Sequence, residues 1–395
     1  MLALEARAIL SGTMDGFRLA KVASLREFAC GDFPVERMLL DLRDPLAAAH
    51  RATLDLLPWA GFIVAPGDEM PADHFALSIL GEAAVAQPGD VVEIQPERGK
   101  IATRYRRGSN GNVLFATERC NSFCLMCSQP PRPIQDDWRV AQLCELVDLI
   151  DSDEPSLAIS GGEPTLLGEG LEQVIRRCAA RLPRTHVHVL SNGRRFGEDF
   201  PAAPFRDCHP SLSWGIPLYG DVAPLHDYVV QSRGAFAQTL RGLYALQAAE
   251  QRIELRIVLV KPVVERLPQI ARFIYRNLPF VEHVALMGTE PIGLALANYD
   301  ALWIDPADAA PQLELAAGML AAHGFSVSLY NLPLCLLPHP LWPFARRSIS
   351  DWKQDYLDAC RDCAVRADCS GVFGWNAKGW RGRAISPIDA ELSHA

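Results

Sequence analysis

The feature that most constrains the fold is an alternation of strand-like and helix-like segments between residues 113 and 330. Short apolar runs alternate there with longer stretches whose apolar residues recur at helical spacing. We expect strands over 113–117, 157–160, 186–190, 212–218, 253–260, 281–287 and 325–330, and helices over 137–150, 171–181, 236–250, 267–277 and 307–323. Strands joined through helices pair in parallel by right-handed crossovers, so the sequence predicts an α/β barrel, open or closed. In such barrels the reactive groups lie in loops at the carboxyl ends of the strands.

The regions on either side of this alternation have a different character. Residues 1–112 begin with a helical-looking stretch and continue with short strand-like pieces at 61–65, 75–80 and 91–95, which predicts an α+β region of unknown role. Residues 331–395 contain early prolines, four cysteines and no long periodic element after Asp358. We therefore expect three parts: an N-terminal region 1–112, a core 113–330 and a small metal-stabilised extension 331–395.

Composition excludes several classes of protein. Of the 395 residues, 49% are hydrophobic and 22% are charged, as in ordinary folded domains. The formal net charge of −9 disfavours a general nucleic-acid binder, which needs a basic surface. No apolar run approaches the roughly 20 residues of a membrane-spanning helix. We expect a cytoplasmic protein, in which eleven cysteines serve as metal ligands or buried thiols more readily than as disulfides.

Three cysteines directly follow the first strand of the predicted core. Cys120, Cys124 and Cys127 have the spacing C-x3-C-x2-C. Three thiolates so close in sequence can bind three irons of a cubane cluster, and the fourth iron then keeps the open position typical of a catalytic metal. The alternatives are a zinc site completed by a distant ligand, and buried thiols without a metal.

This spacing after a strand resembles the radical SAM superfamily, although Met126 stands where members usually have an aromatic residue. The resemblance implies a partial (β/α)6 barrel and a catalytic [4Fe–4S] cluster, held by the three cysteines, that binds S-adenosylmethionine (SAM). Residues 160–164, Ser-Gly-Gly-Glu-Pro, look like the GGEP motif of that family. Gly161 and Gly162 would let the backbone approach the ligand, and Glu163 would accept hydrogen bonds from its amino group, with Pro164 completing the motif.

Further SAM contacts are expected at the ends of later strands. Ser191 and Asn192 could bond the ribose hydroxyls, or simply form a turn with the following glycine. Arg256 shares a strand face with Glu254, so it could bind the SAM carboxylate or pair with Glu254 instead. Met287 could contact the adenine or belong to the core.

A second group of cysteines lies near the C-terminus. Cys360, Cys363 and Cys369 have the spacing C-x2-C-x5-C, and Cys335 is the expected fourth ligand, with Cys30 and Cys208 as competitors. Four thiolates close a metal site completely. The resemblance implies an auxiliary [4Fe–4S] cluster, and zinc and unliganded thiols are the alternatives.

The run from Cys120 to Pro131, together with the C-terminal cysteines, is similar to the maturases of His-Xaa-Ser peptide systems of the HxsC type. This closer resemblance implies a ribosomally made precursor peptide as substrate and a partner radical SAM protein of the same system. It also implies flavodoxin or ferredoxin as the electron donor. Two other functions stay open: a radical SAM enzyme that acts on tRNA or a small metabolite, and a zinc-stabilised interaction protein without catalysis.

Overall fold

The structure is a computed structural model that describes residues 4–14, 18–71, 73–81, 84–197, 199–348, 354–374 and 382–389. The predicted C-terminal region 331–395 thus lies partly outside the described residues. The chain divides into two compact units. Unit 1 comprises Met1–Leu114, Trp138–Leu157 and Arg176–Thr185, and unit 2 comprises Phe115–Asp137, Ala158–Ile175 and His186–Ala395.

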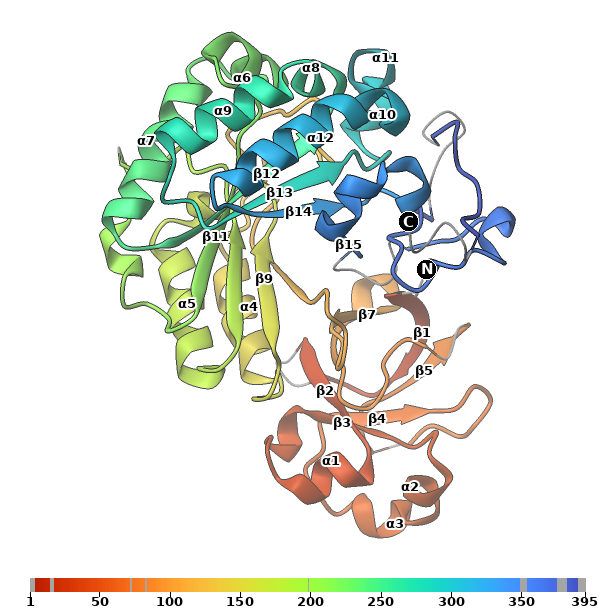
Figure 1. Cartoon of the computed structure of the whole chain (residues 1–395). Coiled ribbons are helices and arrows are strands. Elements are labelled where there is room, and N and C mark those ends of the chain that lie inside the picture. Colours follow the sequence, from red (N-terminus) through yellow and green to blue (C-terminus); the bar gives the residue numbers. More distant parts are fainter. Residues whose placement is uncertain are drawn as a thin grey trace. The chain divides into compact units, whose positions relative to one another are not determined.

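Unit 1 contains a closed barrel with the strand order β1-β5-β4-β3-β2-β6-β7 (Figure 1). Its strands are β1 (Glu5–Ser11), β2 (Leu19–Ala23), β3 (Met38–Asp41), β4 (Gly61–Val64), β5 (Ala76–Leu80), β6 (Val91–Gln95) and β7 (Lys100–Tyr105). Its helices are α1 (Leu25–Cys30), α2 (Pro45–Ala49), α3 (Arg51–Leu54) and α4 (Arg139–Asp148), with short 3-10 helices at Val35–Arg37 and Pro96–Arg98. Neighbouring strands from β2 to β5 are parallel, and the remaining pairs are antiparallel.

Both faces of strand β3 are covered, which explains why all four of its residues are buried. Leu39 packs in one core cluster with Val22 and Ile63. Met38 and Leu40 pack in a second cluster with Trp59 and Leu54, and this cluster includes residues of α2 and α3. A strand buried on both faces is a continuous apolar run without the period-two alternation of a half-exposed strand.

The prediction of a helix at the start of the sequence is wrong, because Glu5–Ser11 forms strand β1. The segment is rich in good helix formers, but it pairs with β5 on one side and with β7 on the other, and so closes the barrel. Pairing on both edges outweighs a local preference of a few tenths of a kcal/mol per residue.

A buried lysine attaches the segment 138–157 to the barrel of unit 1. Lys21 on β2 is completely buried, and its Nζ lies 2.9 Å from both the Leu149 carbonyl oxygen and Asp151 Oδ1. Asp151 also accepts from Arg107, at 2.8 Å, and Tyr105 donates to Glu154, at 2.7 Å. Burial lowers the pKa of Lys21, while the Asp151 carboxylate opposes that shift. These contacts explain why residues after the predicted boundary at 112/113 belong to unit 1.

Most of unit 2 is built on a sheet with the order β15-β14-β13-β12-β11-β10-β9-β8, whose strands β8 and β9 begin in residues of unit 1. Its strands are β8 (Val113–Phe115), β9 (Ser156–Ser160), β10 (His186–Leu190), β11 (Leu212–Pro217), β12 (Arg252–Leu259), β13 (His283–Gly288), β14 (Ser326–Tyr330) and β15 (Ala345–Arg346). All neighbours from β10 to β15 are parallel.

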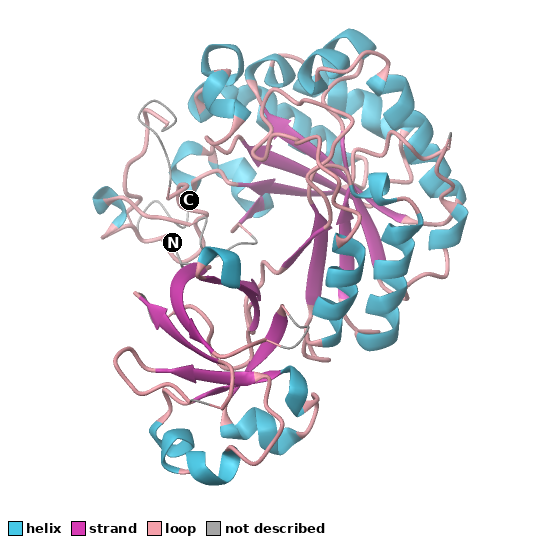
Figure 2. Cartoon of the chain, turned by 180° about the vertical axis from the view of Figure 1, so that it is seen from behind, coloured by secondary structure: helices cyan, strands magenta, loops and turns pink. Residues whose placement is uncertain are grey.

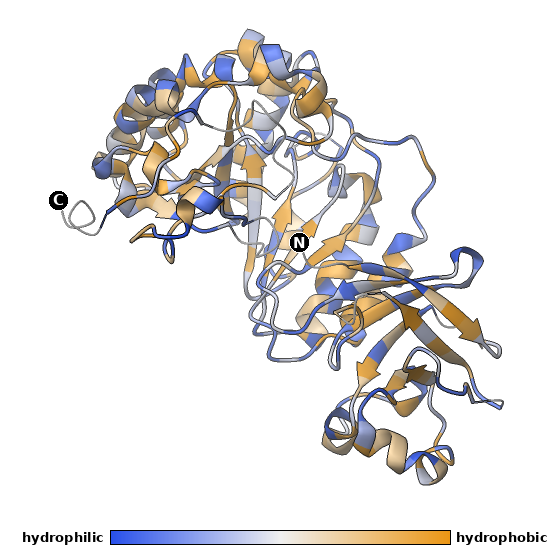
Figure 3. Cartoon of the chain, turned by 90° about the vertical axis from the view of Figure 1, so that its right-hand side faces the viewer, coloured by the Kyte–Doolittle hydropathy of each residue, from blue (hydrophilic) through white to orange (hydrophobic). Residues whose placement is uncertain are grey.

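Helices connect these strands and cover the outer face of the sheet (Figure 2). They are α5 (Glu169–Arg181), α6 (Ala223–Val230), α7 (Ala235–Ala248), α8 (Lys261–Val264), α9 (Leu267–Asn277), α10 (Leu294–Ala297), α11 (Tyr299–Leu302) and α12 (Pro306–Ala322). Short 3-10 helices lie at Pro164–Leu167, Ala203–Phe205, Leu334–Leu336, His339–Phe344 and Asp358–Cys360. Figure 3 shows hydrophobic residues along the strands, as expected for a sheet packed beneath helices.

The predicted α/β class and the parallel sheet are confirmed. The expected (β/α)6 barrel differs in detail, since the described part of the sheet has eight strands and the closed barrel is the one in unit 1. The seven strands expected from the sequence correspond to β8 to β14. The eighth, the two-residue strand β15, was not expected and pairs with β14. In the described part of the chain, no helix combines the length and apolarity needed to cross a membrane.

Candidate functional site

The three cysteines of the first motif lie on one loop, which we call the cluster loop (residues 117–136). Asp136 closes this loop: it is completely buried and accepts from Thr117 Oγ1 (2.8 Å) and the Glu118 backbone N–H (2.7 Å). Arg119 adds an ion pair to the same carboxylate, at 2.9 Å. Both ends of the loop are thus fixed through one side chain.

Two short helices of unit 2 hold the middle of the cluster loop. The backbone N–H groups of Phe123 and Leu125 donate to carbonyl oxygens in the last turn of α6, at 3.1 and 2.9 Å. Asn298, between α10 and α11, donates from Nδ2 to the Leu125 carbonyl oxygen, at 2.9 Å. The Leu294 N–H, at the start of α10, donates to the Cys127 carbonyl oxygen, at 2.9 Å. The loop therefore has a defined backbone path around its cysteines.

The three thiols share a mostly buried environment. Burial raises the pKa of Cys124 to about 12, and the neighbouring Cys120 and Cys127 add to that shift. Burial, with the Glu163 carboxylate, raises the pKa of Cys120 to about 11, and burial also raises the pKa of Cys127. A soft metal ion that binds these sulfurs would have to displace the thiol protons.

The two glycines of the GGEP segment lie against the cluster loop. Gly161 has φ +146°, and a Cβ there would lie 2.5 Å from the Thr117 carbonyl oxygen. A Cβ on Gly162 would lie 2.1 Å from the Arg119 carbonyl oxygen and 3.2 Å from the Cys120 Cβ. The backbone N–H of Gly162 donates to Thr117 O, at 2.7 Å. The absence of side chains is therefore required for this close backbone approach.

Glu163 is completely buried and its carboxylate is already bonded within the protein. It accepts from the Ser191 hydroxyl (2.7 Å), the Asn192 backbone N–H (2.6 Å) and the Thr165 hydroxyl (2.6 Å). Pro164, which follows it, is also buried and begins a 3-10 helix. The expected bond from Glu163 to a ligand amino group therefore competes with these protein donors. Those from Ser191 and Asn192 join the loop after β9 to the loop after β10.

The loop after β10 reaches the cluster loop. Asn192 Nδ2 donates to Asn121 Oδ1, at 2.6 Å. Arg194 donates through Nη1 to the carbonyl oxygen of Asn121 and to the Ser122 hydroxyl, the latter at 2.8 Å. The structure thus brings the candidates after β8, β9 and β10 together at the carboxyl ends of these strands.

Arg256 and Met287 lie on the neighbouring strands β12 and β13. Arg256 Nη1 lies 2.6 Å from Glu254 Oε1, so the intrachain pair left open by the sequence is formed. Glu254 also accepts from His283 Nδ1, at 2.7 Å. Although burial opposes the shift, hydrogen bonds from His188 and His283 and the charge of Arg256 hold the pKa of Glu254 far below its ordinary value. Met287 is half-buried, and its adenine contact stays a prediction.

The four C-terminal cysteines line one small pocket. Cys335, Cys360, Cys363 and Cys369 share it with Tyr356. Burial raises the pKa of Cys335 and of Cys369, and in each case the other cysteines of the group add to the shift. The backbone N–H of Gly371 donates to Cys369 Sγ, and the backbone N–H of Ile388 donates to Cys363 Sγ. The N–S distance is 3.4 Å in both cases.

The competitors for the fourth position lie elsewhere in the fold. Cys30 is exposed on α1 of unit 1. Cys208 is buried near the Glu172 carbonyl oxygen, with an S–O distance of 3.8 Å. Neither lines the C-terminal pocket, so the geometry favours Cys335.

Across the described ranges, no three His, Cys, Asp or Glu side chains lie close enough together to share one metal ion.

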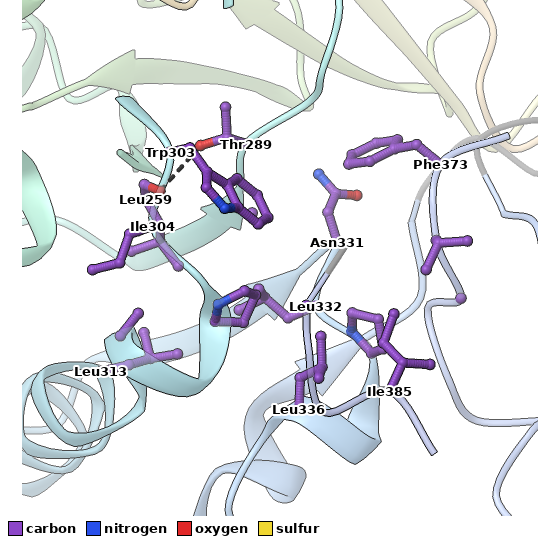
Figure 4. A pocket seen from close by; sticks show the side chains of 17 residues that line it. Leu259, Thr289, Trp303, Ile304, Leu313, Asn331, Leu332, Leu336, Phe373 and Ile385 are labelled. Atoms are coloured by element: carbon purple, nitrogen blue, oxygen red, sulfur yellow. Dashed lines mark hydrogen bonds between the residues drawn. The ribbon is translucent and has the colours of Figure 1, made fainter. Parts of the chain in front are cut away.

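A second pocket of unit 2 lies at the ends of β12 and β13 (Figure 4). Leu259 and Thr289 line it from the strand ends, and Leu332, Phe373 and Ile385 line it from later segments. Its volume of about 50 Å³ is far below the roughly 300 Å³ of a typical ligand pocket. It marks where the C-terminal segment packs on the sheet, not a preformed ligand site.

His226 on α6 makes the stability of this region depend on pH. The ring is 1% exposed, and Nδ1 accepts from the Tyr219 N–H, at 3.2 Å. Burial lowers its pKa to about 4, below the ordinary value near 6.5. The unfolded chain therefore takes up the proton first, so this stabilisation is complete above about pH 6.5 and is lost as the pH falls towards 4.

We expect the free energy of unfolding of unit 2 to fall by about 2 kcal/mol between pH 7.5 and 5 through His226. Denaturation of wild type and of His226→Gln at both pH values measures this contribution. The difference in stability between the two proteins should shrink at pH 5, and a constant difference would contradict the assignment. The same substitution at exposed His323 is the control.

No protein-family model and no curated protein sequence matches this chain. Among solved structures, it is similar to SuiB from Streptococcus suis bound to S-adenosylmethionine, with 13% identity, a TM-score of 0.43 and coverage of 59% of this chain and 51% of SuiB. It is similar to anSMEcpe with bound AdoMet and Cp18Cys peptide, with 16% identity, a TM-score of 0.43 and coverage of 54% and 62%. A third match is HydG, a maturase of the [FeFe]-hydrogenase, with 11% identity, a TM-score of 0.39 and coverage of 56% and 51%.

The chain thus spans about half the length of the SuiB chains that it matches. Identities and TM-scores this low are too weak to assign the function of these proteins to this chain. Its function has to be inferred from its own residues.

Sequence reasoning missed several residues that hold the cluster loop. Asp136 closes the loop from its own end, and Arg194 and Asn298 contact it from separate segments. Arg194 follows the predicted Ser191-Asn192-Gly193 loop directly, and that proximity was an available signal. Asn298 carries no comparable signal because it reaches the loop only through the fold.

Proposed function

We propose that this chain is a radical SAM enzyme that modifies a ribosomally made precursor peptide. The proposal rests on the position of Cys120, Cys124 and Cys127, whose loop lies against the glycine pair 161–162 and the Ser191–Asn192 loop. Three thiols, backbone without side chains and polar groups lie together at the carboxyl ends of three neighbouring strands. This is the edge at which α/β enzymes bind their ligands.

The residues present fit a cubane cluster that binds SAM. Cys120, Cys124 and Cys127 would each bind one iron, and the cluster loop offers no fourth cysteine. When bound, the cluster and SAM supply an electron and a 5′-deoxyadenosyl radical for hydrogen abstraction. The protein's part is to hold the cysteines on a fixed loop and to orient the polar groups of the Ser191–Asn192 loop.

Glu163 has an orienting role in this proposal. Its carboxylate accepts from the Ser191 hydroxyl and the Asn192 N–H, and so fixes the loop proposed to meet the ribose. Ser191 and Asn192, together with Arg256 and Met287 on β12 and β13, remain the proposed SAM contacts. Arg256 would have to share its guanidinium between Glu254 and the SAM carboxylate, which its five donors allow.

The C-terminal cysteines are proposed to hold an auxiliary [4Fe–4S] cluster. Their common pocket, and the backbone N–H groups directed at the sulfurs of Cys369 and Cys363, support anionic thiolates at this place. Hydrogen bonds to ligand sulfurs are among the factors that set the potential of such clusters. A second redox centre would accept the electron that an oxidative modification of a peptide releases.

Metal analysis of the anaerobically reconstituted full chain tests the cofactor proposal. We expect about eight irons and as many sulfides per chain, from two cubanes. About four irons would leave one cluster and remove the auxiliary site. Zinc without iron would instead favour the alternative of a non-catalytic interaction protein.

The substrate proposal follows the resemblance to the HxsC type, with a partner radical SAM protein and a flavodoxin or ferredoxin as expected partners. It is tested with SAM, dithionite and a synthetic peptide with His-x-Ser repeats, read out by mass. A change in the peptide mass supports the proposal. An unchanged peptide alongside a modified tRNA or metabolite would favour the second candidate.

A further inference from the structure

Arg194 hydrogen-bonds the segment between Cys120 and Cys124 through neutral acceptors. Its Nε donates to Gln238 Oε1, at 2.8 Å, and its Nη1 donates to the Asn121 carbonyl oxygen and the Ser122 hydroxyl. All three acceptors are neutral. In contrast, Arg119 pairs with Asp136 and Arg256 pairs with Glu254. Within the described residues, Arg194 forms no ion pair with a carboxylate.

A half-buried guanidinium without a counter-ion needs a reason, because removing a charge from water is costly unless an anion compensates it. Gln238 on α7 fixes one edge of the group, and the cluster loop takes the other. The acceptors on the loop, Asn121 and Ser122, lie between Cys120 and Cys124 in the sequence. The positive charge is thus attached to the segment that joins two proposed iron ligands.

The hydrogen bonds of Arg194 place its charge at the cysteine-bearing segment. Its Nη1 donates to the Asn121 carbonyl oxygen and the Ser122 hydroxyl, and both acceptors lie between Cys120 and Cys124 in the sequence. A fixed cation favours negative charge close to it. An anionic group held by the cysteines would therefore serve as its counter-ion.

We propose that Arg194 is a positioning residue for the cluster loop and the fixed positive charge that stabilises the reduced form of the cluster at Cys120, Cys124 and Cys127. The inference rests on the proposed function, since it presupposes that cluster. Three thiolates on a cubane give a net anion, and reduction adds one more negative charge. A nearby fixed cation stabilises the reduced form more than the oxidised form, so it raises the midpoint potential.

The two roles of Arg194 can be separated by substitution. Arg194→Gln removes the charge and keeps hydrogen-bonding capacity. Arg194→Lys keeps the charge but loses the planar group that bonds Gln238 and the loop at the same time. Arg195→Gln is the matched control: the neighbouring Arg195 donates to the Thr165 carbonyl oxygen and lies over the Phe200 ring, 5.4 Å from its centroid.

The experiment uses the full-length chain, reconstituted anaerobically and titrated with dithionite. The signal followed is the paramagnetic signal of the reduced cluster that changes when SAM is added, which separates it from an auxiliary cluster. Iron is counted first in each variant. We expect a more negative midpoint potential in Arg194→Gln, a potential close to wild type in Arg194→Lys, and no change in Arg195→Gln.

Each outcome of this experiment either supports or contradicts the proposal. If Arg194→Gln keeps its cluster at the wild-type potential, or if Arg194→Lys shifts as far as Arg194→Gln, the charge has no such role and the proposal is wrong. If Arg194→Gln loses the cluster, the result depends on Arg194→Lys. A lysine variant that keeps the cluster at the wild-type midpoint potential supports the proposal, and any other result for that variant contradicts it. A wild-type chain without a SAM-sensitive cluster would instead refute the proposed function, which is a distinct result.

Discussion

Replacement of Cys124 by alanine is expected to abolish SAM cleavage, with 5′-deoxyadenosine falling to the level of a reaction without enzyme. Cys124 is the middle ligand of the proposed site, and two thiols in this loop cannot hold a cubane that needs three. The C-terminal cysteines belong to a separate pocket, so about four of about eight irons should remain. Liquid chromatography with mass detection measures the nucleoside, and metal analysis measures the iron.

Cys30→Ala is the matched control for this variant. Cys30 is an exposed cysteine on α1 of unit 1 and takes part in neither cysteine group. It should leave both the nucleoside yield and the iron content unchanged. Continued formation of 5′-deoxyadenosine by Cys124→Ala would show that the active centre has been assigned to the wrong cysteines.

Substitution of Gly162 by alanine should destabilise unit 2 by about 3 kcal/mol or more and prevent loading of the first cluster. The added Cβ would lie 2.1 Å from the Arg119 carbonyl oxygen, and its other close neighbours are the Arg119 carbonyl carbon and the Cys120 Cβ, so there is no flexible side-chain end that could move aside. The loop after β9 would have to separate from the cluster loop, which breaks the bond from Gly162 N to Thr117 O. Thermal unfolding and iron content are the measurements.

Gly318→Ala provides a control of opposite sign in the same unit. Gly318 lies inside helix α12, and a Cβ there meets no atom within 4 Å. Alanine is favoured over glycine in a helix by about 1 kcal/mol, so this variant should be slightly more stable. If Gly162→Ala proved as stable as wild type, with normal iron content, the close approach of the two loops would not be essential.

The fold of unit 2 could be predicted because its signals are local. The alternation along β12, with Glu254 and Arg256 on one face and Leu255 on the other, follows from the two-residue period of a strand. Helix α9 lies at the predicted residues 267–277 for the same kind of reason, since its buried positions recur at helical spacing. Helix α6 was not predicted, although its last turn holds the cluster loop.

The fold of unit 1 was harder to predict because its strands depend on distant partners. The segment 5–11 has helix-forming residues, and only pairing with β5 and β7 makes it a strand. At the site, the cysteine spacing and the glycine pair are local motifs, whereas the partners of Glu163 lie about thirty residues away. The motif identifies Glu163 as a hydrogen-bond acceptor, but it does not show which donors bond to its carboxylate in the folded chain.

The closure of the cluster loop by Asp136 has a consequence for the loading of the proposed cluster. Thr117, Glu118 and Arg119 are tied to one carboxylate by bonds that involve no sulfur. The cysteine-bearing segment is thus anchored before any metal arrives, and a chain stripped by a chelator should retain its folded scaffold. If the proposed function holds, such a scaffold would accept a new cluster after oxidative loss of the first, without a new round of synthesis.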